Sequence, residues 1–256
     1  EITTRLVGSE MCIRDRIELE LTTECNLYCN NCNRSCGQAR SSECITLEQM
    51  ELFVEESILN GYYWDSIILL GGEPTLHYDL FGIVKILHKY QNFNKRCRFE
   101  IVSNQFSEKS KILLDKLPEW ISIRNEKKIS SINLFSRCHE APVDKIKKEY
   151  DFSTACQIAQ VSGMGFSRYG YYACGPAAAI DRVFGFDLGI KKINEINIIN
   201  LQKQMNLFCS LCGHFLDYRE DFKSNWSYKE CISETWQEAY KRYHDNPPKL
   251  KLYNGK

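Results

Sequence analysis

The hydrophobic pattern of the first half of the chain changes repeatedly between strand-like and helix-like spacing. Alternating apolar and polar positions, or short apolar runs, predict strands at residues 17–22, 66–70, 98–103, 119–124 and 131–136. Helical spacing with capping signals predicts helices at residues 46–60, 78–90 and 107–117. Because strands and helices alternate at this spacing, we expect parallel βαβ units in an open sheet or a barrel.

The second half has a different pattern. Glycine, tyrosine, alanine and cysteine crowd the segment from Cys156 to Gly189, and the periodicity is lost. This favours a small module that something other than a large apolar core holds together. A last helix is predicted at residues 233–243. The expected fold class is α/β, with a barrel over residues 17–137, an auxiliary module over 138–216 and a helical tail over 217–256.

Residues 1–16 stand apart from the rest. Leu6 to Arg16 read LVGSEMCIRDR, which resembles a translated sequencing adapter. The string has no clear period and joins abruptly to the strand at Ile17. We expect a non-native segment here; the alternative is a genuine N-terminal arm.

Charge and composition narrow the classes of protein. The chain has 33 basic and 33 acidic side chains, so it lacks the positive excess that binds nucleic acid or an anionic membrane. No apolar run approaches the ~18 residues of a membrane span, and no signal-peptide pattern is present. We therefore expect a cytoplasmic protein whose 13 cysteines are reduced or metal-bound rather than bridged.

Three cysteines follow the first strand at a spacing that suits a metal cluster. Cys25, Cys29 and Cys32 form C-x3-C-x2-C on one loop. Three thiolates can hold three irons of a [4Fe–4S] cubane and leave the fourth iron open, as catalysis requires. Cys36 could serve as a fourth ligand and would complete the pattern C-x3-C-x2-C-x3-C. A closed structural cluster or a zinc site therefore stays an alternative.

A glycine motif follows the second strand. Its residues are Gly71, Gly72, Glu73 and Pro74. Parallel strands end at one rim, so this motif should lie beside the cysteine loop, where α/β folds bind ligands. Two glycines allow the backbone to approach a ligand closely.

Together these motifs resemble the radical S-adenosylmethionine (radical SAM) enzymes over about residues 17–137. The resemblance implies a partial (β/α) barrel and a [4Fe–4S] cluster at Cys25, Cys29 and Cys32. It implies that S-adenosylmethionine (SAM) binds the open iron, with its amino group against Gly71, Gly72 and Glu73. Ser103 and Asn104 resemble the ribose-contacting position. Reductive cleavage of SAM then gives a 5′-deoxyadenosyl radical that abstracts hydrogen, with electrons from a donor such as a flavodoxin or ferredoxin.

Two further observations concern the ligand-binding side. The family has an aromatic residue before the third cysteine, against adenine; this chain has Asn31 there, whose backbone could supply the contact, and its aromatic residue is Tyr28. Strand alternation also turns polar side chains toward the lumen: Glu18, Glu20, Thr22, Glu100, Ser122, Arg124 and Asn133. A polar lumen predicts a cavity for a polar substrate. A one-residue error in the face assignment would reverse this set.

A second cysteine group comprises Cys156, Cys174, Cys209 and Cys212. The stretch C-x13-G-x3-C, with Gly170 as the glycine, resembles the opening of the SPASM/twitch module, which usually has four residues where this chain has three. Four thiolates predict a second [4Fe–4S] cluster or a structural zinc. A fully ligated cluster has no open iron, so electron transfer is its expected role.

The expected function is hydrogen abstraction by a radical SAM enzyme, either an oxidoreductase on a small polar metabolite or a peptide maturase. No catalytic side chain is assigned, although the run Cys138-His139-Glu140 is a candidate hydrogen donor or base near the rim. The alternative is a non-catalytic iron–sulfur or zinc-binding protein that uses Cys36 as its fourth ligand.

Overall fold

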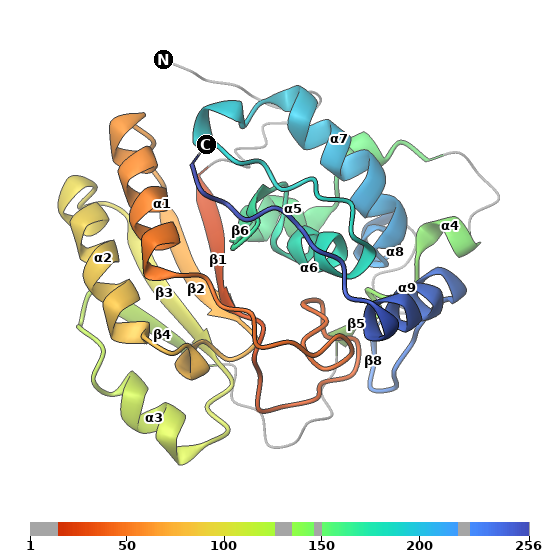
Figure 1. Ribbon diagram of the computed structural model, residues 1–256, viewed down its shortest axis with the longest axis horizontal. Coiled ribbons are helices and arrows are strands. Elements are labelled where there is room, and N and C mark those ends of the chain that lie inside the picture. Colours follow the sequence, from red (N-terminus) through yellow and green to blue (C-terminus); the bar gives the residue numbers. More distant parts are fainter. Residues whose placement is uncertain (1–14, 126–134, 146–149, 220–225, 256) are drawn as a thin grey trace.

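The computed structural model describes residues 15–125, 135–145, 150–219 and 226–255. A six-stranded sheet with the order β4-β3-β2-β1-β6-β7 forms its centre (Figure 1). Its strands are β1 (Arg16–Thr22), β2 (Ser66–Gly71), β3 (Arg98–Ser103), β4 (Ile121–Asn125), β6 (Met164–Ser167) and β7 (Gly170–Tyr172). The strands from β4 to β6 in this order are parallel, and β7 is antiparallel to β6. Five carboxyl ends therefore meet at one edge.

Helices from the first half of the chain lie beside strands β1 to β4 (Figure 1). They are α1 (Leu47–Leu59), α2 (Leu80–Phe93) and α3 (Glu108–Leu114). The predicted start of α1 is confirmed: the Thr46 hydroxyl accepts from the Gln49 amide, and the Gln49 side chain accepts from the Thr46 amide. This capping box satisfies amides that the helix itself leaves unpaired.

The second half of the chain joins the same sheet. Its helices are α4 (Pro142–Lys145), α5 (Gln157–Ser162), α6 (Gly175–Phe184), α7 (Ile198–Phe208), α8 (His214–Arg219) and α9 (Glu234–Asp245). Short 3₁₀ turns occur at Pro74–Leu76, Phe152–Thr154, Ile193–Glu195 and Cys209–Leu211. Strand β6 pairs with β1, so the sheet extends across the boundary predicted at residue 137. The division into domains stays a prediction.

The expectation that residues 138–216 lack a large apolar core is wrong. Met164, Phe166 and Tyr171 are fully buried in the same apolar cluster as Leu19. A second cluster packs α6 and α9 together through small and aromatic side chains, including Ala178. The burial escaped the sequence analysis because alanines and aromatics replace the branched residues that make periodicity visible.

The strand predicted at residues 131–136 does not take the expected place. Residues 131–134 lie outside the described part of the chain. Phe135–Ser136 form β5, which pairs antiparallel with β8 (Trp226–Ser227) rather than with the main sheet. In the described residues, the fifth parallel strand is β6, on the other side of β1.

The described fold begins two residues before the boundary predicted at Ile17. The Asp15 carbonyl accepts hydrogen bonds from the amides of Asp65 and Ser66, at 2.6 and 3.1 Å. Arg16 opens β1 and pairs with Ser66. Residues 1–14, most of the expected non-native segment, lie outside the described residues.

Among the described residues, no helix combines the length and the apolar character needed to cross a bilayer.

Candidate metal and cofactor site

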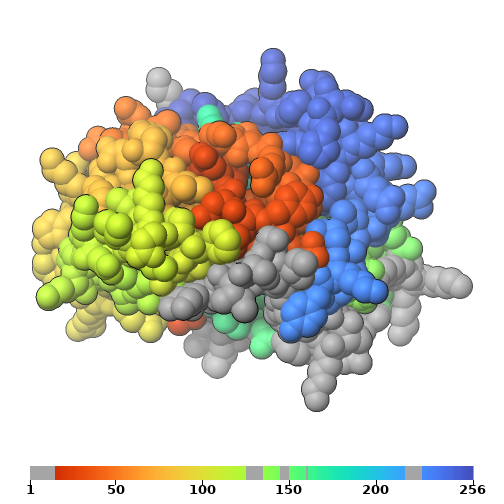
Figure 2. All heavy atoms as spheres, turned by 90° about the horizontal axis from the view of Figure 1, so that it is seen from below, coloured from red at the N-terminus to blue at the C-terminus, as the bar shows by residue number. Residues whose placement is uncertain are grey.

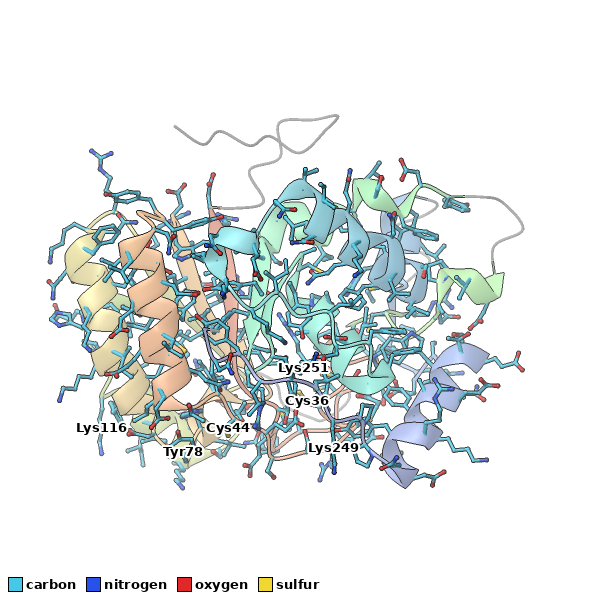
Figure 3. The ribbon with its side chains drawn as sticks, turned by 45° about the horizontal axis from the view of Figure 1, so that its top comes forward. Cys36, Cys44, Tyr78, Lys116, Lys249 and Lys251 are labelled. Atoms are coloured by element: carbon cyan, nitrogen blue, oxygen red, sulfur yellow. The ribbon has the colours of Figure 1, made fainter. Side chains whose placement is uncertain are left out.

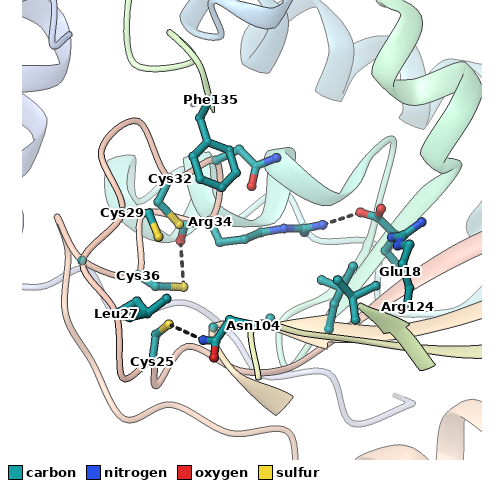
Figure 4. Close-up of a pocket in the computed structure, with 16 residues that line it drawn as sticks. Glu18, Cys25, Leu27, Cys29, Cys32, Arg34, Cys36, Asn104, Arg124 and Phe135 are labelled. Carbon is teal, nitrogen blue, oxygen red and sulfur yellow. Dashed lines mark hydrogen bonds and ion pairs between the residues drawn. The ribbon is translucent and has the colours of Figure 1, made fainter. Parts of the chain in front are cut away.

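A cavity of about 260 Å³ opens at the carboxyl edge of the sheet (Figure 4). The structure brings the two sequence motifs together in its lining. The residues concerned are Cys25, Cys29, Cys32, Cys36, Gly71 and Gly72. Asn104 also lines the cavity, from the end of β3. Parallel pairing of β1, β2 and β3 therefore gathers three loops at one place, as expected for an α/β ligand site.

The thiols of the first cysteine loop differ in acidity. Hydrogen bonding from the Cys36 thiol lowers the pKa of Cys32 to about 5. Burial raises the pKa of Cys25 to about 11. Thiolates are the form that binds metal, so of these two thiols Cys32 loses its proton more readily and Cys25 less readily when metal binds.

Cys36, labelled near the middle of the view in Figure 3, is a buried residue. Its residue is 4% exposed and lines the same cavity as the three motif cysteines. The hydrogen bond to Cys32, together with burial, raises its pKa well above the ordinary value. This position is compatible with two roles for Cys36, a protonated thiol beside the cluster and a fourth ligand of the cluster.

The glycines are required by the close approach of β1 and β2. Gly71 has φ +143°, and the Gly72 amide donates to the Thr22 carbonyl at 2.7 Å. A Cβ at Gly72 would lie 2.1 Å from the Glu24 carbonyl oxygen. Any side chain here would push the cysteine loop away, so Gly72 shapes the loop as well as the cavity wall.

Glu73 is fully buried and does not line the cavity. Its carboxylate accepts hydrogen bonds from the Ser103 hydroxyl at 2.8 Å and the Asn104 amide at 2.9 Å. It also accepts from Thr75, and Pro74 begins the short turn that carries this residue. In this conformation Glu73 connects the glycine motif to Ser103 and Asn104. Direct contact between Glu73 and SAM stays a prediction.

Asn104 and Asn31 have different surroundings. The Asn104 side chain donates to Asn26 at 2.9 Å and lies 3.9 Å from the Cys25 sulfur. Asn31 is fully buried and does not line the cavity. Its amide donates to Glu230, and its carbonyl accepts from Cys138. The expected adenine contact at residue 31 stays a prediction.

Sequence reasoning missed Arg34, the charged partner of the lumen acids. Its guanidinium extends along the cavity to form an ion pair with Glu18, and its Nη1 lies 4.0 Å from Glu20 (Figure 4). Burial raises the pKa of the Glu20 carboxyl, although Arg34 opposes the shift. The sequence offered one signal, a single arginine between Cys32 and Cys36. Its two acidic partners lie on β1 and are brought to it by the fold.

The other lumen residues lie as strand alternation predicted. Glu18 and Arg124 line the cavity. Glu100 pairs with Arg124 across β3 and β4 at 3.1 Å, and the Ser122 hydroxyl donates to Phe99. Asn133 lies outside the described residues. Glu18, Glu100 and Arg124 therefore lie on the predicted side of the sheet, where Leu70 and Val102 also line the cavity.

The four cysteines of the second group line one small cavity, as expected for a shared site. They are Cys156, Cys174, Cys209 and Cys212. Burial raises the pKa of Cys174 to about 12. His214 lines the same cavity and was missed by the sequence analysis, although it follows Cys212 by two residues. Within the described ranges, no three histidine, cysteine, aspartate or glutamate side chains are grouped to hold a single metal ion.

Cys138 and His139 do not stand at the cavity rim. They are 3% and 1% exposed. The Cys138 thiol donates to the Asn31 carbonyl at 3.2 Å, and a His139 ring nitrogen lies 3.0 Å from the Cys32 carbonyl oxygen. Cys138 and His139 therefore do not fit the candidate role of a hydrogen donor or base at the rim. Both side chains instead contact the back of the first cysteine loop.

No protein-family model matches the chain. A segment of 74 residues is 38% identical to a probable GTP 3′,8-cyclase of Thermoplasma volcanium. A segment of the same length is 35% identical to a probable GTP 3′,8-cyclase of Pyrococcus horikoshii. These relatives indicate an enzyme. They also support the resemblance to the radical SAM superfamily. Each match covers 29% of this chain and less than a quarter of the relative, 22% and 23%.

Two solved structures align with part or most of this chain. SuiB of Streptococcus suis, bound to S-adenosylmethionine, is 16% identical at a TM-score of 0.30, over 42% of this chain and 22% of that one. BtrN, in complex with AdoMet and 2-DOIA, is 13% identical at a TM-score of 0.45, over 85% of this chain and 96% of that one.

Proposed function

We propose that this chain is a radical SAM enzyme that abstracts hydrogen from a polar substrate. The observation that carries the proposal is the shared cavity of Cys25, Cys29 and Cys32 with Gly71 and Gly72. Thiolates suit iron–sulfur clusters, and a wall without side chains suits a ligand that must come close to the backbone. When bound, the cluster and SAM would supply a 5′-deoxyadenosyl radical.

The residues of the site divide into holding and shaping roles. Cys25, Cys29 and Cys32 would hold the [4Fe–4S] cluster. Gly71 and Gly72 would face the SAM amino group. Asn104 would contact the ribose, because it lines the cavity beside Cys25. Glu73 and Ser103 support this arrangement from behind, through the hydrogen bond between them.

The substrate is expected to be polar. Glu18, Arg34 and Arg124 line the cavity, so a polar substrate could exchange hydrogen bonds with charged groups of its wall. A small polar metabolite and a peptide are both compatible with such a lining. We favour the small metabolite, because the charges lie within the cavity and not along an open groove.

The second cysteine group would hold a second [4Fe–4S] cluster. Four thiols line one small cavity, which supports full thiolate ligation and a role in accepting an electron from the substrate radical. A flavodoxin or ferredoxin would supply the electron that starts each reaction. All described cysteines are free thiols, which favours a reducing compartment such as the cytoplasm.

One specific observation keeps a second candidate function. Cys36 lines the first cavity together with the three motif cysteines, so it could complete a closed cluster or a zinc site. Such a protein would bind metal and leave no iron open to SAM.

The proposal is tested by reconstituting the chain without oxygen and adding SAM to the reduced protein. We expect about eight irons per chain, the sum of two cubanes, and a change in the electron paramagnetic resonance spectrum when SAM binds the open iron. Cys29→Ala should lose about four irons and the SAM-dependent change together. A fully loaded protein whose spectrum ignores SAM would favour the closed-cluster alternative.

A further inference from the structure

The first cysteine loop is held by a segment almost 200 positions later in the chain. We call this segment, residues 227–231, the strap. The Asn31 side chain donates to the carbonyls of Ser227 and Lys229, at 3.3 and 2.7 Å, and accepts from the Cys231 amide at 2.8 Å. In Figure 2 the red-orange early part of the chain lies directly beside the blue C-terminal part on one face of the molecule.

The strap holds a backbone conformation that the loop alone would not favour. Asn31 has φ +55°, in the left-handed region that non-glycine residues seldom adopt. Asparagine tolerates this region better than most residues. Asn31 lies directly before Cys32, so its conformation sets the direction in which the third thiol leaves the loop.

Glu230 is the centre of the contacts between the strap and the loop. Its Oε1 accepts from the Asn31 amide at 3.0 Å, and its Oε2 accepts from the Gln38 side chain at 2.9 Å. Its Oε1 also lies 3.5 Å from His139 Nδ1. One carboxylate from the strap therefore contacts three groups around the cysteine loop.

Two of these groups, Gln38 and His139, also contact the backbone carbonyls of cysteines in the loop. The Gln38 side chain also donates to the Cys29 carbonyl at 3.0 Å. The other ring nitrogen of His139 lies 3.0 Å from the Cys32 carbonyl oxygen. Glu230 is thus one side chain away from two of the three expected cluster ligands.

Helix α9 packs behind this network. The rings of Trp236 and Tyr240 lie 4.6 and 5.6 Å from the His139 ring, between centroids. The Tyr240 hydroxyl lies 2.9 Å from the Ser35 hydroxyl. Aromatic packing fixes His139, so the imidazole can hold the Cys32 carbonyl in one place.

We propose that Glu230 is a positioning residue for the first cluster, which orients Cys29 and Cys32 through Gln38, His139 and Asn31. The inference rests on the proposed function in naming these cysteines as ligands. Groups that orient metal ligands from behind typically change metal affinity 10–100-fold when they are removed. We expect a loss of iron affinity in that range for Glu230→Ala, because three contacts disappear at once.

The test compares three full-length variants. Glu230→Ala removes the three contacts of the carboxylate and leaves the bonds of Asn31 to the strap backbone in place, whereas Glu230→Gln keeps an oxygen that can accept from the Asn31 amide. Tyr228→Ala is the matched control, because this side chain is 62% exposed and its backbone carbonyl still accepts from Asn30. Iron loss to a chelator should be fastest in Glu230→Ala, intermediate in Glu230→Gln, and unchanged in Tyr228→Ala.

A second readout uses the metal-free protein and does not depend on the proposed function. Amide hydrogen exchange in residues 25–38 should be faster in Glu230→Ala than in the wild type, and unchanged in Tyr228→Ala. Wild-type exchange and wild-type iron retention in Glu230→Ala would overturn the inference, even in an active enzyme. Faster exchange in a protein that never binds SAM would instead refute the proposed function alone. If Glu230→Ala does not fold, the same comparison applies to Glu230→Gln.

Discussion

Arg34 and Glu18 form a buried ion pair at the point where the two cysteine sites approach each other. Arg34 belongs to the first cysteine loop, and Gly175, next to Cys174, packs directly against the pair. A Cβ at Gly175 would lie 2.1 Å from the Glu18 carboxylate and 2.2 Å from the Arg34 guanidinium. The start of α6 is therefore glycine because a charged pair occupies the space of any side chain.

Removing the arginine should be costly. Arg34→Met leaves Glu18 and Glu20 buried without their cation, and breaking a buried pair typically costs about 3–5 kcal/mol. The free energy of unfolding in urea at pH 7 measures this cost. Lys89→Met is the control, since its pair with Glu51 is exposed and should contribute less than about 1 kcal/mol. Equal losses in both variants would contradict the role given to Arg34.

Gly72→Ala should disturb the metal site itself. The new Cβ would meet the Glu24 backbone beside Cys25, so overpacking should cost about 1–3 kcal/mol and iron should be lost from the first site. Gly61→Ala is the control: its Cβ meets no atom within 4 Å, and the left-handed backbone alone should cost about 1–2 kcal/mol. Full iron retention in Gly72→Ala would show that the loop adapts.

Removing two thiols of the second site should leave the first site loaded. In Cys209→Ala with Cys212→Ala, iron should fall from about eight to about four per chain, and SAM binding should persist. Turnover of the substrate should fail, because its electron would have no acceptor. Cys97→Ala, a buried thiol outside both cavities, should keep all the iron. Retained turnover in the double variant would reduce the second site to a structural role.

His77 should make stability depend on pH. Burial lowers the pKa of its imidazole, which accepts from the Asp79 amide and hydrogen-bonds to the Ile45 carbonyl at 2.8 Å. As the pH falls below about 6.5, the unfolded chain binds a proton at His77 before the folded chain does. The free energy of unfolding should therefore decrease as the pH is lowered. Urea unfolding at pH 8 and pH 5.5 should show a smaller difference in His77→Gln than in the wild type. An equal difference in both proteins would contradict this account.

Local signals predicted much of the first half of the fold. Alternation in residues 17–22 gave β1, and Thr46 with Gln49 gave the start of α1, because such patterns act over a few residues. Strand β6 is four residues long and contains Gly165, so nothing local separates it from a loop. Its strand character comes from pairing with β1, almost 150 residues earlier.

The candidate site likewise combines residues that local spacing identifies with residues that the fold brings together. The spacing of Cys25, Cys29 and Cys32 is local, and it identified the cluster loop. The contact between Asn31 and Glu230 joins residues 199 positions apart. The ion pair between Arg34 and Glu18 likewise forms only when the chain folds. Such partners have no characteristic spacing, so the charged network around the loop becomes visible in three dimensions.

The most direct test of the central claim is the amount of 5′-deoxyadenosine that the reduced, reconstituted protein forms from SAM. Wild type and Cys36→Ala should both form it, because three thiolates leave one iron open to SAM. Cys29→Ala should form none. A wild-type protein that holds its full iron and forms no 5′-deoxyadenosine would contradict the assignment of this chain as a radical SAM enzyme.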